Sequence, residues 1–270
     1  MCVAAVFMVV LGLISGQPLF FSVSKFTEYP WWTWLGGFLG DVALTLNVML
    51  LPHLGAVQTI IMPLVGQIVT SMLIDNFGWF GLPVHSFSWL RLLGIAVIFF
   101  GVYLVVARNK TDQSEASPVG TKIVLWQGLG IITGVILALQ TSTNGALNRT
   151  LTSPISAGAF SFVNGAIIML VAVGILEHDF DHVKWAVGKG NPWYIWLGGF
   201  LGAAYTVGNL FLAPLIGTGT AVVLVLLGNM IGSSVIDKFG LLDNPKRVID
   251  WRKYAGLVIL LLGVLAVKFF

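Results

Sequence analysis

The chain has 270 residues, of which 57% are apolar and only 9% are charged, and its formal net charge is +3. Soluble domains carry roughly 25% charged residues, so this composition excludes a water-soluble globular protein. The single cysteine excludes an internal disulfide and argues against a cysteine-ligated metal site. The small positive charge bears on which loops face the cytoplasm rather than on binding to nucleic acid.

Long apolar stretches predict about nine membrane-spanning helices. Such a helix needs roughly 17 to 25 apolar residues, and these stretches lack the alternation that marks a transmembrane strand. In chain order the predicted helices cover residues 1–19, 33–51, 55–75, 89–107, 122–147, 154–176, 193–213, 217–237 and 251–269. The expected fold class is therefore an all-α integral membrane protein, a polytopic helix bundle. Pro52 with Gly55, and Pro214 with Gly217, predict tight turns between consecutive helices.

A seven-residue sequence occurs twice, at Trp34–Gly40 and again at Trp196–Gly202. At the same offset Asn47 aligns with Asn209, and many glycines of the two halves align as well. This identity predicts a duplicated unit. The expected organisation is a first repeat over 1–110, a polar linker over 111–121 and a second repeat over 122–270.

The two repeats differ in helix number, because the second has five predicted helices and the first has four. The helix at 1–19 aligns with the one at 154–176, so the counterpart of 122–147 is absent from the first repeat. We expect an upstream first helix that this chain does not include; a protein that works with nine helices is the alternative. Two tandem units of five helices insert in opposite orientations, which is the inverted repeat of many secondary transporters.

Lysine and arginine residues support the opposite orientations. In the second repeat the connection before the last helix is basic, whereas the equivalent connection in the first repeat retains only Arg91. Loss of positive charge from one copy is what the positive-inside rule requires if the copies face opposite ways. The same rule places the central linker in the cytoplasm and the C-terminus on the outer side of the membrane.

Several short motifs occur in a characteristic order. They are Gln140-x3-Asn144-Gly145-x2-Asn148, Ser153-Pro154, Phe160-x-Phe162-x2-Gly165, the second Trp-Leu-Gly-Gly-Phe-Leu-Gly, Gly228-Asn229 and Ser234-x-Ile-Asp237-x-Phe-Gly240. In these motifs the chain resembles the drug/metabolite transporter superfamily and, within it, the YdcZ family of inner-membrane proteins. The resemblance implies an antiparallel ten-helix fold with a substrate path between the halves. The chain departs from the family by lacking the first helix and by having Asn229 where glutamine is usual.

Asp41 is an acidic residue in the middle of the predicted helix 33–51, and its repeat equivalent is Ala203. A carboxylate near the bilayer centre costs roughly 2.5 to 3.5 kcal/mol on insertion scales, so it should face a cavity, find a partner or stay protonated. One interpretation is a proton- or cation-coupling site. The other is a protonated or hydrogen-bonded acid that serves only helix packing.

Gln140 and Asn144 are one helical turn apart and therefore share a face. Buried amides in lipid need hydrogen-bond partners, so this pair could bind a polar substrate or link two helices. The same two interpretations apply to further polar residues at repeat-equivalent positions: Gln67 with Ser71, Asn229 with Ser233, and Asn47 with Asn209, the last with Tyr205 nearby. Pro63 could break the helix before Gln67 and free backbone carbonyls.

Other features are interpreted as structural. The Gly36-x3-Gly40 and Gly198-x3-Gly202 spacings would let helices approach closely. Asp75 and Asp237 would cap helix ends next to Phe-Gly pairs. The acidic and histidine residues between 177 and 182 lack a metal-ligand spacing, so we expect a solvated loop and no metal site.

These features favour a secondary transporter in the cell (inner) membrane that moves a small polar or amphipathic metabolite or drug by alternating access. No phosphate-binding Gly-Lys-Ser/Thr loop is present, so ion coupling is expected, most simply to protons. A channel or a non-transporting membrane subunit is the alternative, and an intramembrane enzyme would need clustered acids or histidines that the predicted helices lack. The expected partners are the lipid bilayer and a small-molecule substrate, and a homodimer is compatible with the sequence. No cofactor is expected.

Overall fold

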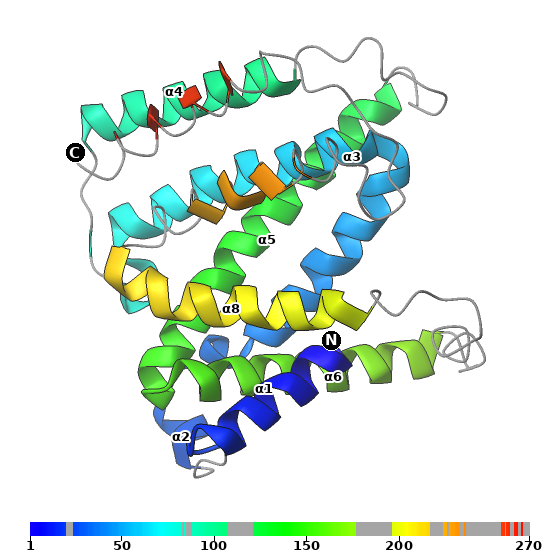
Figure 1. Cartoon of the computed structure of the whole chain (residues 1–270), viewed down its shortest axis with the longest axis vertical. Coiled ribbons are helices and arrows are strands. Elements are labelled where there is room, and N and C mark those ends of the chain that lie inside the picture. Colours follow the sequence, from blue (N-terminus) through cyan, green and yellow to red (C-terminus); the bar gives the residue numbers. More distant parts are fainter. Residues whose placement is uncertain are drawn as a thin grey trace. The chain divides into compact units, whose positions relative to one another are not determined.

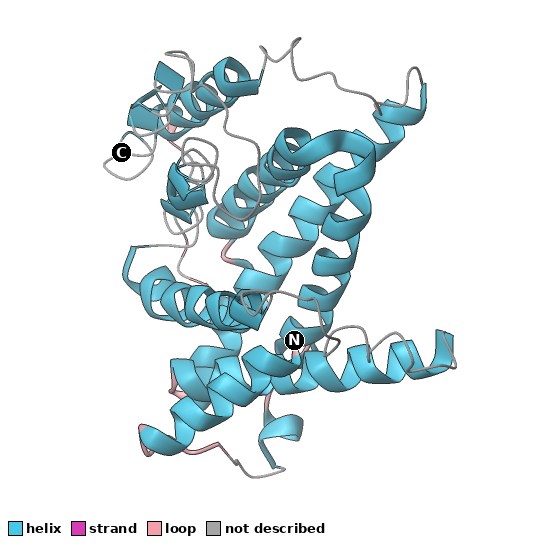
Figure 2. Ribbon diagram, turned by 45° about the vertical axis from the view of Figure 1, so that its right-hand side comes forward, coloured by secondary structure: helices cyan, strands magenta, loops and turns pink. Residues whose placement is uncertain are grey.

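The computed structural model describes residues 1–19, 24–82, 84, 88–106, 121–176 and 196–216, with scattered residues between 224 and 266. Every regular element in this described part is helical (Figure 2). The elements are α1 (Cys2–Ile14), α2 (Ser24–Glu28), η1 (Trp31–Trp34), α3 (Gly36–Phe77), η2 (Trp79–Gly81), α4 (Trp89–Val106), α5 (Thr121–Leu151), α6 (Pro154–Leu176) and α8 (Leu197–Ile216). The predicted all-α class is confirmed for these residues, and most of the predicted helices 217–237 and 251–269 lies outside them.

Three of the described helices contain stretches long and apolar enough to cross a membrane. These stretches are Gly36–Leu54 in α3, Ile123–Leu151 in α5 and Pro154–Ile175 in α6. Shorter apolar helical stretches cover Cys2–Ile14, Leu92–Gly101 and Leu197–Leu212. Length and composition therefore agree with a membrane helix bundle, while the inverted repeat stays a prediction.

The chain forms two compact units. Unit 1 contains Met1–Leu44 and Leu139–Leu215, and unit 2 contains Thr45–Ala138 and Ile216–Phe270. Each unit takes residues from both halves of the sequence.

Helix α3 corrects the prediction of a tight turn at Pro52 and Gly55. The helix runs without a break from Gly36 to Phe77, with Pro52 and Pro63 inside it. It changes direction sharply near its middle, where its colour passes from blue to cyan (Figure 1). Proline removes one backbone hydrogen bond and crowds the preceding turn, so it bends a helix more readily than it ends one. The expected local break at Pro63 is likewise not found.

Glycines bring α3 and α5 into backbone contact within unit 2. A Cβ added to Gly66 of α3 would collide with the carbonyl oxygen of Ile131 in α5. In the reverse direction, a Cβ on Gly134 of α5 would collide with the carbonyl oxygen of Pro63 and lie 2.7 Å from the backbone nitrogen of Gln67. Small residues at helix interfaces allow this close packing, which is a main source of helix association in membranes.

The turn between α5 and α6 arranges the helices of unit 1. Thr152 has a positive φ of 55°, and the Ser153 hydroxyl accepts a 3.2 Å hydrogen bond from the backbone N–H of Ser156. Ser153 therefore caps α6, with Pro154 in the first helical position, as proline prefers. Asn148, one turn before the end of α5, donates a 2.9 Å hydrogen bond to the backbone oxygen of Leu210 in α8. Polar residues near the end of α5 thus cap the start of α6 and link α5 to α8.

Helix α1 lies beside α6 in unit 1 (Figure 1). Their contact forms a buried cluster of Ala4, Met8, Ala159 and Ala203, the last contributed by α8. A second cluster surrounds Trp34, whose ring lies 4.2 Å from that of Phe26 and 5.1 Å from that of Phe160. These two apolar clusters hold the helices between which the polar residues of the candidate site lie.

Candidate substrate pocket and buried carboxylate

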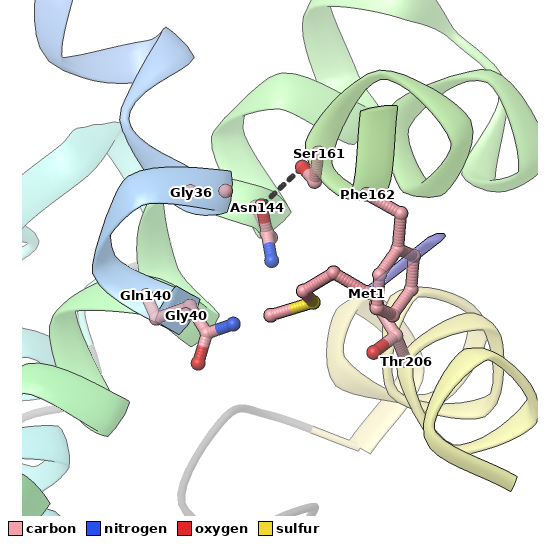
Figure 3. A pocket seen from close by; sticks show the side chains of 9 residues that line it. Met1, Gly36, Gly40, Gln140, Asn144, Ser161, Phe162 and Thr206 are labelled. Carbon is pink, nitrogen blue, oxygen red and sulfur yellow. Dashed lines mark hydrogen bonds between the residues drawn. The ribbon is translucent and has the colours of Figure 1, made fainter. Parts of the chain in front are cut away.

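A small pocket lies inside unit 1 and is lined by four helices (Figure 3). Its empty space, including the open mouth, is about 230 Å³. The lining residues come from α3, α5, α6 and α8, together with Met1: Gly36, Gly37, Gly40, Gln140, Asn144, Ser161, Phe162 and Thr206. The predicted pair Gln140 and Asn144 therefore does share a face, and that face lines this pocket.

Asn144 is fixed by a hydrogen bond from the neighbouring helix. Its Oδ1 accepts a 2.7 Å bond from the hydroxyl of Ser161. The side chain is only 6% exposed. Its amide nitrogen points into the pocket, as does the amide nitrogen of Gln140 (Figure 3). Sequence reasoning missed Ser161, because nothing in a linear pattern shows that a serine of α6 lies opposite Asn144.

Two glycines of α3 make room for these amides. A Cβ on Gly36 would collide with Oδ1 of Asn144, and one on Gly40 would lie 2.5 Å from Nε2 of Gln140. Close backbone approach, the role predicted for this pair, belongs instead to Gly37, whose added Cβ would collide with the backbone oxygen of Ser161. Gly36 and Gly40 are thus part of the pocket as well as of the helix packing.

Asp41 of α3 is buried next to the pocket, where its side chain faces α6. Its side chain is 4% exposed, and neither carboxylate oxygen has a hydrogen-bond partner among the described residues. A Cβ on Gly165 would lie 3.2 Å from both oxygens, so the glycine leaves the space that the carboxyl group fills. Asp41 does not line the pocket, although it directly follows Gly40, which does.

The other predicted site residues are not in this pocket. Gln67 and Ser71 are buried and Asn47 is half-buried in the part of α3 that belongs to unit 2. The hydroxyl of Tyr205 forms a hydrogen bond with Asn209 on α8. Asn229 is exposed, and Ser233 lies outside the described residues.

The features interpreted as structural have mixed outcomes. Gly198 and Gly202 have no described atom within 4 Å of an added Cβ, so these two glycines do not make the predicted close approach; Gly199 does, because its added Cβ would lie 2.7 Å from the Cβ of Val3 in α1. Asp75 lies in the last turn of α3, which ends just before Gly78 in the left-handed conformation with φ of 62°. Asp237 and the acidic and histidine residues of 177–182 lie outside the described residues.

A comparison with family models gives one match that covers nearly the whole chain. The model is described as "Putative inner membrane exporter, YdcZ", and it matches residues 1–104 and 125–266. No curated protein matches the chain. The order of motifs through both halves and the helical membrane stretches agree with this match, and the chain belongs to the YdcZ family of inner-membrane proteins that this model describes.

Proposed function

We propose that the protein is a secondary transporter that exports a small polar or amphipathic solute across the inner membrane by alternating access, coupled to protons. The observation that carries the proposal is a pocket lined by polar side chains of several helices, beside a buried carboxyl group without a described hydrogen-bond partner. The family description as an exporter supports transport rather than enzyme chemistry.

The environment of Asp41 supports its role in coupling. A buried charge without hydrogen bonds is costly inside the membrane, so the carboxyl group favours the neutral form while it is enclosed against Gly165. Access to water on one side of the membrane would allow it to lose its proton. A group that changes charge with access can link proton movement to a change of conformation.

Proteoliposomes with an imposed pH gradient test this function. The vesicles contain a pH-sensitive dye, and a mixed panel of small metabolites and cationic drugs is added from outside. We expect at least one solute to cause saturable proton movement, which Asp41→Asn abolishes. Asp75→Asn, in the same helix but two residues before its end, is the matched control and should retain the movement.

The outcomes separate the parts of the proposal. Saturable transport that survives Asp41→Asn would keep the transporter and remove Asp41 from coupling. A non-saturating flux with discrete single-channel currents would favour a channel.

A further inference from the structure

The pocket lies at the positive end of a long helix. Helix α3 begins at Gly36, and its first intrahelical hydrogen bond runs from the N–H of Leu39 to the oxygen of Leu35 at 3.0 Å. The N–H groups of Gly36, Gly37 and Phe38 precede that bond, as in any helix N-terminus. Such an end carries a positive partial charge that stabilises anions. Gly36 and Gly37 are both lining residues, so this end of the helix forms part of the pocket wall.

Asn144 adds a hydrogen-bond donor that has no acceptor. Its Oδ1 lies next to Gly36 at the positive helix end and accepts from Ser161, which is where an oxygen is electrostatically favoured. The amide nitrogen therefore points the other way, into the pocket (Figure 3). This nitrogen has no partner among the described residues, although the side chain is only 6% exposed. An acceptor oxygen on a ligand in the pocket would satisfy this donor.

The other lining residues of the pocket suit a ligand that has one polar end and one apolar part. Nε2 of Gln140 also points into the pocket, without a described partner (Figure 3). No acidic or basic side chain is among the described lining residues, whereas Phe162 and Met1 offer apolar surface. The hydroxyl of Thr206 donates to the oxygen of Gly202 at 3.0 Å, so its own oxygen can only accept there. The oxygen of Thr206 would therefore suit a second group on the same ligand that donates a hydrogen bond.

We propose that the pocket binds a carboxylate group, whose oxygens accept hydrogen bonds from the amide nitrogens of Asn144 and Gln140, close to the positive end of α3. The solute that the transporter carries is then a small carboxylic acid. This assignment rests on the proposed function and specifies its substrate class.

Binding of three small molecules of similar size tests the assignment without any transport. Purified protein is heated in detergent with increasing acetate, acetamide or ethylammonium, and sodium chloride at equal concentration controls for ionic strength. A ligand that binds the folded state raises the thermal midpoint with concentration. We expect acetate to raise it saturably, and acetamide and ethylammonium to leave it at the value in sodium chloride.

Two charge-changing variants locate the binding. Asn144→Asp and Gln140→Glu keep the size of the side chain and place a negative charge in the pocket, which should weaken acetate binding by more than about tenfold. Asn76→Asp makes the same change outside the pocket and should bind acetate like the wild type. If Asn144→Asp does not fold, Gln140→Glu alone tests whether acetate binds in the pocket, because Gln140 is half-buried and a charge there is better tolerated.

The result also separates this inference from the proposed function. Asp41→Asn, which should abolish coupling, is expected to bind acetate at least as tightly as the wild type. Stabilisation by ethylammonium or equally by acetamide would overturn the carboxylate assignment, and so would stabilisation by acetate that survives Gln140→Glu or disappears in Asp41→Asn. Absence of stabilisation by all three would overturn it too, while the proton-flux assay would still decide whether the protein is a transporter.

Discussion

Asp41 has an unfavourable position by the usual rules of helix packing in membranes. Both of its oxygens are buried without a described hydrogen-bond partner. After the second copy of the heptapeptide the corresponding residue is Ala203, which is fully buried in an apolar cluster. A buried carboxyl group without a described hydrogen bond does not stabilise the packing of α3 against α6, so Asp41 calls for an explanation other than stability.

Asp41→Ala should therefore stabilise the protein while removing proton coupling. Elimination of an unsatisfied buried polar group is expected to raise the free energy of unfolding by about 1 to 3 kcal/mol. The measurement is reversible unfolding in mixed micelles. Asp75→Ala is the control, because Asp75 has an interaction partner and its removal should bring no gain. A destabilised Asp41→Ala protein would mean that the acid contributes to packing after all.

Part of the site could be predicted at this scale and part could not. The four-residue spacing of Gln140 and Asn144 placed them on one face, and the structure confirms that they line one pocket. Ser161, Phe162 and Thr206 complete that pocket from other helices, and their contribution depends on which helices are neighbours. Sequence periodicity describes the faces of one helix and contains no information about the helix opposite.

Helix packing depends on a few glycines in α3, α5 and α6. Prediction recognised Gly36 and Gly40 by their spacing, but of the three glycines in this heptapeptide it is Gly37 that meets the backbone of another helix most closely. The second copy also packs closely at the equivalent glycine, because a Cβ on Gly199 would lie 2.7 Å from the Cβ of Val3 in α1, whereas Gly198 and Gly202 have no described neighbour. The fourth residue of the heptapeptide thus approaches another helix in both copies, while the other two glycines are covered only in the first copy, because that depends on the neighbouring helix.

Gly37→Ala should destabilise the protein, since the new Cβ would meet the backbone of α6, which cannot move aside as a flexible side chain can. We expect a loss of about 1 to 3 kcal/mol, the usual cost of overpacking. Gly145→Ala is the control in α5, because no described atom lies within 4 Å of its Cβ position. The better helix propensity of alanine should make that variant up to about 1 kcal/mol more stable. Equal thermal midpoints for the two variants would contradict this account of the interface.

The bend of α3 shows a different limit of sequence reasoning. Pro52 and Gly55 between two apolar stretches favour a turn, and the same two residues permit a bent helix. The choice depends on whether tertiary contacts retain helical backbone through the bend, which local propensity does not determine. The predicted apolar stretches on either side were nevertheless placed close to where helical structure is found.

For the whole molecule, family membership and the all-α membrane class were predictable, because both depend on composition and on the order of motifs. The orientation in the membrane remains a prediction, since it follows from the distribution of lysine and arginine alone.

Cysteine labelling tests that orientation. Cys2 is the only cysteine and is exposed, so Cys2→Ser gives a protein without thiols. A cysteine is then introduced at Gln113 in the predicted cytoplasmic linker. A membrane-impermeant maleimide should label it in inverted vesicles and not in intact cells. Labelling in intact cells would place the linker outside and reverse the predicted topology.

The backbone contacts between α3 and α5 have a consequence for the gene. Gly66 and Gly134 each leave no space for a Cβ. Every amino-acid substitution of glycine adds at least a Cβ atom, so no missense mutation at these two codons is conservative. In a saturation screen they should be depleted of every substitution, including alanine, whereas lipid-facing leucines should exchange freely with other large apolar residues.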